Sequence, residues 1–385
     1  MSAASTPVID PVELTRDLIR KPSVTPADEG AMDVLERVLM DLGFHCRRMP
    51  FENIENLYAR RGSEGPNLCF AGHTDVVPTG AADAWSSGPF AAEVKDGVLY
   101  GRGAVDMKGG IAAWVAAVSA VLLEGDVPGS LSFLITGDEE GPALHGTKRV
   151  VETLLAEGEV IDACVVGEPS SQLHLGDMIK IGRRGSLNSW ITVHGKQGHV
   201  AYPDRAANPA PVLVRLLAAL DAHSLDDGYE AFQPSNLEIT TIDIGNPATN
   251  VIPAEAKARL NIRFNPGQTG DGLTDWLNRE AGRVQAETGL RITLEHMCSG
   301  EAFLTPPGDF VTAVQDAVEA ETGRRPEAST TGGTSDARFI RAMAPVLELG
   351  LVGQTMHQFD ERVPVAELEA LAGVYRRVIQ AVLKA

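Results

Sequence analysis

Seven acidic and histidine side chains are the main candidates for chemistry in this sequence. They are His73, Asp75, Asp106, Glu139, Glu140, Glu168 and His357. Six of them follow apolar runs that read as buried strands, and sites in open α/β sheets form at the carboxyl ends of strands. Asp106 instead follows the loop LYGRGAV, whose glycines allow a sharp turn before a helix. We therefore expect one crevice to collect all seven side chains.

Five carboxylates in one crevice would repel one another, and burial would make each harder to ionise. Lys108 and Arg102 are too few cations to offset this charge. Divalent metal ions would resolve the conflict, and a mixture of imidazoles and carboxylates suits zinc, cobalt or manganese better than calcium. With three or more carboxylates available, one can bridge two ions about 3.5–4 Å apart, as in two-metal hydrolases.

Each candidate also has an ordinary structural interpretation. The H-x-D pair could form a hydrogen bond within a loop, and the doubled glutamates could be a solvated turn or a helix cap. Asp106 could cap the next helix, Glu168 could be a solvated loop acid, and His357 could be a partly buried histidine. The recurrence of such side chains at strand ends favours the joint metal site over these separate interpretations.

The composition predicts a globular protein without a polyanionic partner. The 385 residues, 44% hydrophobic and 22% charged, suggest two to three domains. A formal net charge of −19 argues against nucleic acid or an anionic membrane surface. The cysteines lie far apart without a C-x-x-C pair, and the stretch MSAASTPVIDPVEL lacks the pattern of a signal segment. We expect a soluble cytoplasmic protein without membrane association.

The elements that must position these residues follow an α/β order. Strand-like runs at 67–72, 130–136 and 161–167 alternate with helical patterns such as 109–123. This alternation predicts an α/β domain with a mixed central sheet, made from residues 1–183 and 298–385.

The pattern changes between the two parts of that domain. Residues 184–297 read as strand, helix, two strands, helix and strand. The order βαββαβ is that of a ferredoxin-like α+β unit. We therefore predict an inserted domain over these residues.

Several motifs resemble one known family. The segments GHTDVVPTG, YGRGAVDMKGGIAA, TGDEEG and VVGEPS resemble those of the metallopeptidase family that contains aminoacylases, carboxypeptidases and acetylornithine deacetylase. The segments RRGSL, VHGKQGHVAYP, ATNVIP, SGEAFLT, TTGGTSDARF and TMHQFDE are similar to members that act on N-succinyl-LL-2,6-diaminopimelate. The resemblance covers nearly the whole chain.

The resemblance implies two zinc ions per subunit, with cobalt or manganese as substitutes. Asp106 would bridge the ions, His73 and Glu168 would hold one, and Glu140 and His357 would hold the other.

Two further acids of the set would work beside these ligands. Asp75 would orient the imidazole of His73. Glu139 would be the general base that takes a proton from the metal-activated water, and Asp138 would be structural.

The resemblance also implies a set of residues near the substrate. They are Arg183, Ser186, His199, Tyr202, Asn250, Arg263, Gly333 and Thr334. Arginines, with Arg184 and Arg338 as further candidates, can clamp a carboxylate with two hydrogen bonds. His199 would reach the active site of a partner subunit, which implies a homodimer through the inserted domain and closure of that domain as a lid. Gly353 stands where related enzymes often carry Asn, so a side-chain hydrogen bond to the substrate is lost or replaced.

The implied reaction is hydrolysis of N-succinyl-LL-2,6-diaminopimelate to succinate and LL-2,6-diaminopimelate, in the synthesis of lysine and cell-wall precursors. SGEAFLT and the doubled arginines of RRGS favour the succinyl substrate. One alternative is another N-acyl amino acid deacylase, such as acetylornithine deacetylase or an aminoacylase. The other is a metal-free, catalytically silent relative that serves as a binding or dimerisation module.

Overall fold

The computed structural model describes residues 7–384, and the chain divides into two units. Unit 1 comprises residues 1–181, 305–329 and 335–385, and unit 2 comprises residues 182–304 and 330–334. The first six residues of the stretch expected to lack a signal segment lie outside the described residues. Within the described part, no helix is both long and apolar enough to cross a membrane.

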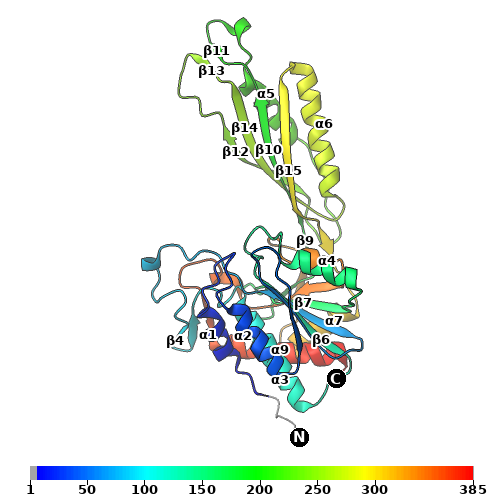
Figure 1. Ribbon diagram of the computed structural model, residues 1–385. Coiled ribbons are helices and arrows are strands. Elements are labelled where there is room, and N and C mark those ends of the chain that lie inside the picture. Colours follow the sequence, from blue (N-terminus) through cyan, green and yellow to red (C-terminus); the bar gives the residue numbers. More distant parts are fainter. Residues whose placement is uncertain (1–6, 385) are drawn as a thin grey trace. The chain divides into compact units, whose positions relative to one another are not determined.

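Unit 1 is built on a mixed eight-stranded sheet (Figure 1). In spatial order its strands are β1 (His45–Arg48), β2 (Asn56–Arg61), β6 (Ser130–Thr136), β3 (Asn67–His73), β7 (Ala163–Val166), β18 (Val346–Glu348), β8 (Met178–Lys180) and β17 (Glu327–Ser329). A smaller sheet contains β19 (Arg362–Pro364), β5 (Val98–Tyr100) and β4 (Glu93–Lys95).

The helices of unit 1 cover this sheet. They are α1 (Pro11–Ile19), α2 (Ala31–Asp41), α3 (Lys108–Glu124), α4 (Thr147–Glu157), α7 (Asp309–Thr322), α8 (Ala337–Ile340) and α9 (Val365–Leu383). Helices α1, α3 and α9 pack together (Figure 1). Phe70 of β3 stacks on Trp114 of α3 with ring centroids 4.9 Å apart and meets Tyr375 of α9 edge-on. These aromatic contacts fix α3 and α9 against the centre of the sheet.

Four strands of unit 1 end at the same edge of the sheet. β3 is parallel to both β6 and β7, and β18 is parallel to β7. His73 is the last residue of β3 and lies opposite Thr136, the last residue of β6. The segments that follow these strands therefore begin side by side, as the sequence predicted for the candidate residues.

Unit 2 contains a four-stranded antiparallel sheet with two helices. The sheet has the order β12 (Asn236–Asp243), β14 (Glu255–Phe264), β10 (Gly185–His194) and β15 (Arg291–Gly300), and the helices are α5 (Pro209–Asp221) and α6 (Gly270–Thr288). Two short pairs join it, β11 (Gly198–His199) with β13 (Val251–Ile252), and β9 (Gly182–Arg183) with β16 (Phe303–Leu304). Along the chain the main elements run β10, α5, β12, β14, α6 and β15.

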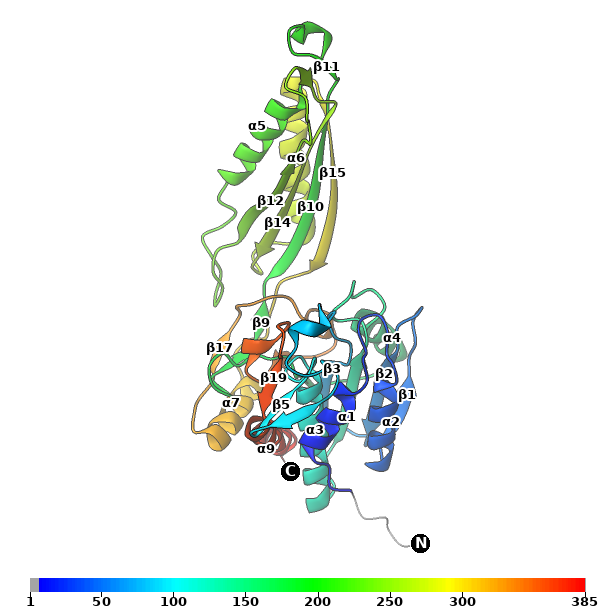
Figure 2. The same cartoon turned by 90° about the vertical axis from the view of Figure 1, so that its left-hand side faces the viewer.

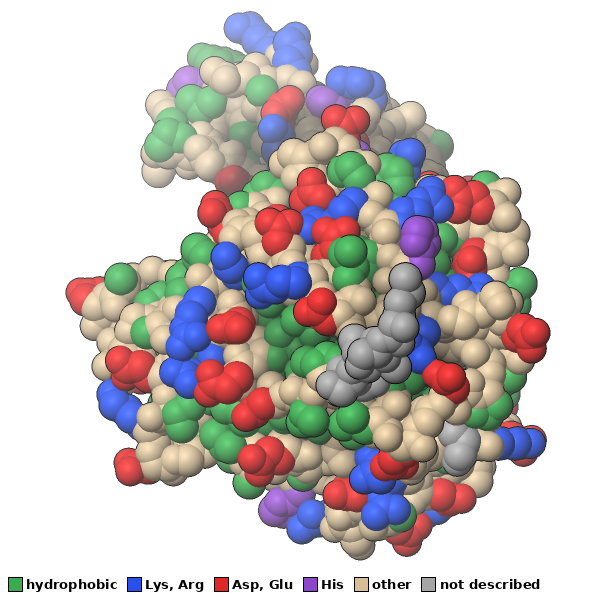
Figure 3. Space-filling model, turned by 60° about the horizontal axis from the view of Figure 1, so that its bottom comes forward, with side chains coloured by type: hydrophobic (Ala, Val, Ile, Leu, Met, Phe, Trp, Pro, Cys, Tyr) green, Lys and Arg blue, Asp and Glu red, His purple; other side chains and the backbone are tan. Residues whose placement is uncertain are grey.

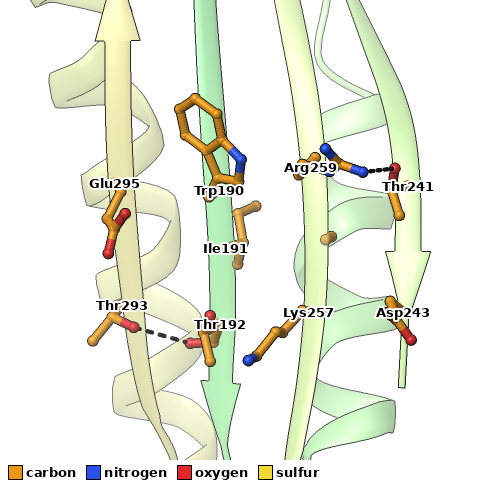
Figure 4. A pocket seen from close by; sticks show the side chains of 10 residues that line it. Trp190, Ile191, Thr192, Thr241, Asp243, Lys257, Arg259, Thr293 and Glu295 are labelled. Atoms are coloured by element: carbon orange, nitrogen blue, oxygen red, sulfur yellow. Dashed lines mark hydrogen bonds between the residues drawn. The ribbon is translucent and has the colours of Figure 1, made fainter. Parts of the chain in front are cut away.

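Strict alternation gives this sheet one buried and one open face. In β14 the residues Ala258, Leu260 and Ile262 are buried under the helices. Lys257 and Arg259, which alternate with them along the strand, are exposed. The open face carries a hollow of about 440 Å³ (Figure 4). Its lining residues are Trp190, Ile191, Thr192, Thr241, Asp243, Lys257, Ala258, Arg259, Thr293 and Glu295. None of these is among the residues predicted to lie near substrate.

The boundaries of the two units differ by a few residues from the predicted domain limits. Strand β16 pairs with β9, so residues up to Leu304 belong to unit 2, whereas the predicted domain ended at residue 297. Arg183 Nη1 also donates to the backbone oxygen of Thr331 at 3.0 Å, inside the segment 330–334 that clusters with unit 2. Such contacts between distant segments leave no periodic pattern in the sequence.

The surface mixes both signs of charge. On the face shown in Figure 3, Lys and Arg side chains are interspersed with Asp and Glu side chains. Exposed side chains of opposite charge also form ion pairs, such as Arg283 Nη1 with Glu287 at 2.7 Å. Exposed pairs of this kind contribute little to stability.

Candidate metal centre

Asp106 lies between two pairs of candidate ligands in unit 1. On one side, its Oδ1 is 3.2 Å from His73 Nε2, and that nitrogen is 3.6 Å from Glu168 Oε1. On the other side, its Oδ2 is 3.2 Å from His357 Nε2, which is 2.8 Å from Glu140 Oε1. One carboxylate thus presents an oxygen to each pair, which is the arrangement of a bridging ligand.

Most of these side chains are withdrawn from water. The exposed fractions are 1% for His73, 8% for Asp106, 9% for Glu140 and 12% for Glu168, whereas His357 is 48% exposed. Two groups of three residues each bring their ligand atoms within 4.8 Å of one another. The groups are His73, Asp106 and Glu140, and His73, Glu139 and Glu168.

Asp75 differs from expectation in the way it contacts its neighbours. His73 Nδ1 donates to the backbone oxygen of Asp75 at 2.8 Å, and the carboxylate Oδ1 of Asp75 is 3.7 Å from that nitrogen. The carboxylate instead accepts hydrogen bonds from the backbone N–H groups of Glu139 at 3.2 Å and Glu140 at 3.0 Å. The backbone of Asp75 therefore orients the imidazole, while its side chain fixes the loop that carries both glutamates.

Asp106 does not cap the helix that follows it. Helix α3 begins after Met107, and no side chain makes a capping hydrogen bond there. His357 has a left-handed backbone conformation with φ of +61°. This conformation is uncommon for a residue with a side chain and concentrates at functional sites.

The cluster holds more negative charge than its imidazoles balance. Burial raises the pKa of Glu139 and of Glu168 well above the usual range of a carboxyl group. Burial would raise the pKa of Asp106 too, but hydrogen bonds with the two histidines hold it below its ordinary value. Hydrogen bonds with Asp106 and Glu140 raise the pKa of His357 to about 10. For these two acids the effect of burial therefore outweighs the nearby positive charge of His73.

The nearby basic side chains have other partners. Arg102 Nη1 donates to Glu361 at 2.7 Å, and Lys108 Nζ donates to the backbone oxygen of Lys21 at 2.8 Å. Glu168 Oε1 is buried and accepts no hydrogen bond from the described residues. A divalent cation coordinated by this oxygen and by His73 Nε2 would satisfy it, so the residues present fit a metal centre.

Glu361 has no role predicted from the sequence, although it follows His357 by four residues within TMHQFDE. Its side chain is 0% exposed and accepts hydrogen bonds from the backbone N–H groups of Val105 and Asp106. The only available signal was a glutamate in the same motif as a predicted ligand.

Three of the predicted substrate residues lie near one end of the sheet of unit 2. Ser186 of β10 lies opposite Arg263 of β14, and Arg183 precedes them in β9. Arg184 Nη1 donates to Asn236 Oδ1 at 2.9 Å, and Asn236 lies opposite Arg263, so the two arginines are close to each other. Burial lowers the pKa of Arg184, as does the positive charge of Arg263. Neighbouring arginines without an acidic partner suit a bound carboxylate.

Three other predicted substrate residues lie at the opposite end of this sheet. His199 of β11 pairs with Val251 of β13, next to Asn250, and its ring centroid is 5.7 Å from that of Tyr202. β11 follows the end of β10, whereas Ser186 stands at its start (Figure 2). Ten residues of strand separate the two groups, on the order of 30 Å. Unit 2 of one chain therefore does not bring them together.

Gly333 and Thr334 belong to the segment 330–334 of unit 2. Gly333 is exposed and Thr334 is half-buried. The neighbouring Gly332 has φ of +109°, and a Cβ there would lie 2.2 Å from Arg183 Nη1. Glycine at that position lets the segment approach the guanidinium.

The sequence is similar to a group of curated relatives along nearly its whole length. A succinyl-diaminopimelate desuccinylase of Caulobacter vibrioides is 67% identical over 372 residues, which cover 97% of this chain and 96% of that protein. Succinyl-diaminopimelate desuccinylases of Maricaulis maris and Rhodospirillum rubrum are 58% and 56% identical, over 100% and 96% of this chain and 98% and 97% of theirs.

Solved structures share the fold at much lower identity. An M20 family metallo-carboxypeptidase from Sulfolobus solfataricus matches with a TM-score of 0.81 at 16% identity, covering 98% of this chain and 100% of that one. Aminopeptidase PepT from Bacillus cereus matches with a TM-score of 0.80 at 19% identity, over 97% and 98% of the two chains. Residues 69–381 match the model of peptidase family M20/M25/M40. Together with the close relatives, this match shows that the chain belongs to peptidase family M20/M25/M40.

Proposed function

We propose that this protein hydrolyses N-succinyl-LL-2,6-diaminopimelate to succinate and LL-2,6-diaminopimelate. The observation that carries the proposal is that relatives 67% identical over nearly the full chain bear the name succinyl-diaminopimelate desuccinylase. The ligand set around Asp106 supports a metal-dependent hydrolase over a silent binding module. The product would enter the synthesis of lysine and cell-wall precursors, in the cytoplasm.

The proposed cofactor is a pair of zinc ions in each subunit, which cobalt or manganese can replace. His73 and Glu168 hold one ion, Glu140 and His357 hold the other, and Asp106 bridges them. When bound, the ions polarise the scissile carbonyl and lower the pKa of water. Imidazole and carboxylate ligands of this kind suit zinc.

Glu139 is the proposed general base and acid. Its carboxylate takes a proton from the attacking water while the oxygen forms a bond to the succinyl carbonyl carbon. The same carboxyl group then gives the proton to the amide nitrogen as the carbon–nitrogen bond breaks. Burial, which raises the pKa of Glu139, supports its ability to hold this proton between the two steps. Asp75 positions Glu139 through the backbone hydrogen bond.

The substrate carries three carboxylates, which require positive partners in a protein of net charge −19. We assign one carboxylate to the group of Arg183, Arg263 and Ser186. The proximity of Arg263 to Arg184 supports this assignment and makes Arg184 a further candidate. The backbone N–H groups of Gly333 and Thr334 would receive a carboxylate as well.

We further propose that residues 184–297 form a ferredoxin-like dimerisation and lid domain, and that residues 1–183 and 298–385 form the catalytic domain. The order βαββαβ and the antiparallel sheet support this interpretation. Because His199, Tyr202 and Asn250 lie at the far end of unit 2 from Arg183, they would serve the active site of the partner subunit in a homodimer. His199 would stabilise the oxyanion that forms during attack.

The test is amine release from two substrates. Zinc-loaded protein is incubated with N-succinyl-LL-2,6-diaminopimelate and, separately, with N-acetylornithine, each with and without a chelator. The proposal predicts chelator-sensitive release from the succinyl substrate alone.

Release from the acetyl substrate alone would move the protein to another deacylase activity with the same metal centre. No release from either substrate, in protein that holds metal, would contradict the proposed reaction and favour the silent relative.

A further inference from the structure

Glu361 is a buried carboxylate to which the proposed chemistry gives no role. Its Oε1 accepts hydrogen bonds from two successive backbone N–H groups, those of Val105 at 2.9 Å and Asp106 at 3.2 Å. Hydrogen bonds to a buried charged group are stronger than those between neutral groups. Glu361 therefore fixes the orientation of the peptide units on either side of Val105, directly before the side chain proposed to bridge the metal ions.

Arg102 neutralises this carboxylate and ties two distant segments together. Its Nη1 donates to Glu361 Oε2 at 2.7 Å and to the backbone oxygen of Gln358 at 3.3 Å. The guanidinium lies 5.2 Å from the ring centroid of Trp85, and its side chain is 3% exposed. The N–H of Gly101 donates to the backbone oxygen of Glu361 at 2.9 Å. Both the backbone and the side chain of Glu361 thus link residues 101–106 to residues 358–361.

The first linked segment contains Asp106, and the second directly follows His357. Their side chains meet at 3.2 Å, between Asp106 Oδ2 and His357 Nε2. His357 is 48% exposed and has a left-handed backbone, so packing alone restrains it weakly. Two buried attachments follow it, the hydrogen bond from Arg102 to the backbone oxygen of Gln358 and the side chain of Glu361 four residues later.

We propose that Glu361 is a positioning residue of the metal centre, which sets the distance between the bridging carboxylate of Asp106 and the imidazole of His357. This inference rests on the proposed two-metal function. It predicts that loss of Glu361 weakens binding of the ion held by Glu140 and His357 more than binding of the other ion. Partners that orient metal ligands typically change metal affinity by about 10–100-fold when they are replaced.

An ordinary buried ion pair would support the fold without favouring the metal centre. The two oxygens of Glu361 have different partners, which supports a positioning role as well as a role in the fold. Oε2 accepts the hydrogen bond from Arg102, whereas Oε1 accepts from the two N–H groups before the Asp106 side chain. A pair of double variants separates the two roles.

The first variant is R102Q/E361Q and the second is R102M/E361M. In the first, the new amide at position 361 keeps an oxygen that accepts from the N–H groups of Val105 and Asp106, and its own N–H donates to the amide carbonyl introduced at position 102. The methionine pair fills the same space without charge and offers the backbone no comparable acceptor. Metal-free protein is titrated with Co²⁺, and the absorption bands of the two sites are followed together with the melting temperature.

The proposal predicts that R102Q/E361Q binds both ions as the unmodified chain does. R102M/E361M should bind the second ion about 10–100-fold more weakly, with altered bands for that site. Equal affinities in the two double variants, whether both are retained or both are reduced, would overturn the proposal. A chain without substitutions that takes up no Co²⁺ would contradict the two-metal function itself.

R60Q/E159Q is the matched control. This ion pair lies at the other ends of the strands, where Arg60 Nη2 donates to Ser130, the first residue of β6. Its loss should leave both metal affinities unchanged.

If R102M/E361M does not fold, E361D provides the test. Aspartate keeps the negative charge opposite Arg102 but draws its oxygens back from the two N–H groups. E361D should weaken the second ion, and unchanged affinity for both ions would overturn the proposal.

Discussion

Three consecutive acids in the loop after β6 have three different environments. Asp138 Oδ2 accepts hydrogen bonds from two backbone N–H groups of the same loop, at 2.8 and 2.9 Å. Glu140 Oε1 lies 2.8 Å from His357 Nε2. Ligand atoms of Glu139, His73 and Glu168 lie within 4.8 Å of one another. We therefore assign Asp138 to loop structure, Glu140 to metal binding and Glu139 to proton transfer.

Replacing Glu139 by Gln should keep the metal ions but abolish most of the turnover. The amide retains the shape of the side chain but cannot carry the proton, a contribution typically worth about 10²–10⁴-fold in rate. The measurement is kcat together with bound metal per chain.

The neighbouring substitution Glu140→Gln provides the contrast, because it removes a proposed ligand and should reduce bound metal. Near-normal kcat in Glu139→Gln with full metal content would remove Glu139 as the base.

At the scale of elements, helix α3 packs against the end of β7 through a glycine. A Cβ on Gly110 would lie 2.6 Å from the backbone oxygen of Gly167, the residue before Glu168. The small side chain of glycine therefore lets the helix approach the segment that presents this ligand.

Gly110→Ala should cost about 1–3 kcal/mol of stability through overpacking and should displace Glu168. Gly282 in α6 is the control, because a Cβ there meets nothing within 4 Å. Gly282→Ala should stabilise the chain by up to about 1 kcal/mol through helix propensity. Urea unfolding and zinc affinity of both variants give the comparison, and equal effects of the two substitutions would contradict the packing argument.

Asp226 holds together the connection between α5 and β12. Its Oδ1 accepts from the N–H of Gly228 at 2.9 Å, the N–H of Ser235 at 3.1 Å and Asn265 Nδ2 at 2.8 Å. Burial alone would raise the pKa of Asp226, but these donors, with the Ser235 hydroxyl, hold it below the ordinary value. The ionised form is therefore favoured in the folded chain.

Asp226→Asn should lower the free energy of unfolding at neutral pH, by an amount that shrinks in acid. A lowered pKa in the folded state stabilises the fold above the unfolded value of 3.8, and this stabilisation is lost as the pH falls through the folded value. Urea unfolding of both proteins at several pH values measures the difference. A difference that grows as the pH falls below 4 would have the wrong sign.

The sequence predicted many of the long elements and missed several of the shortest ones. α3, β6 and β14 carry a continuous apolar run or a strict alternation, so their patterns are visible locally. β8 and β17 have three residues each, too few to show a period, and they pair with each other across 149 positions of the sequence, as Met178 does with Glu327.

The same distinction applies to the candidate site. His73 and Glu168 were predictable because they end or follow apolar strands. Glu361 was not, because it acts on backbone N–H groups more than 250 positions away, and no local spacing records such a contact. The carboxylate contacts of Asp75 were missed for the same reason, since they too reach backbone groups of a distant loop.

At the scale of the whole molecule, the proposed activity needs two copies of the chain. The residues near Arg183 and those near His199 lie at opposite ends of unit 2, separated by the ten residues of β10. If a partner subunit supplies His199, a defect in one chain can be complemented by another chain.

Mixing His199→Ala chains with Glu139→Gln chains should therefore restore activity that neither has alone. A mixed dimer contains one site with both Glu139 and His199, so full exchange should give about one quarter of the unmodified rate. Succinate release after subunit exchange measures this, with exchange confirmed by mass-tagged chains. Complete exchange without recovery would contradict a role for His199 across subunits.

Asp106 and its four neighbours are proposed to hold two metal ions, so the number of ions bound per chain is the decisive quantity. Metal-free protein is dialysed against zinc, and the zinc per chain is measured by elemental analysis. We predict two ions per chain, with Asp106→Asn reducing both. A chain that retains less than one ion, or an Asp106→Asn variant that still retains two, would contradict the account.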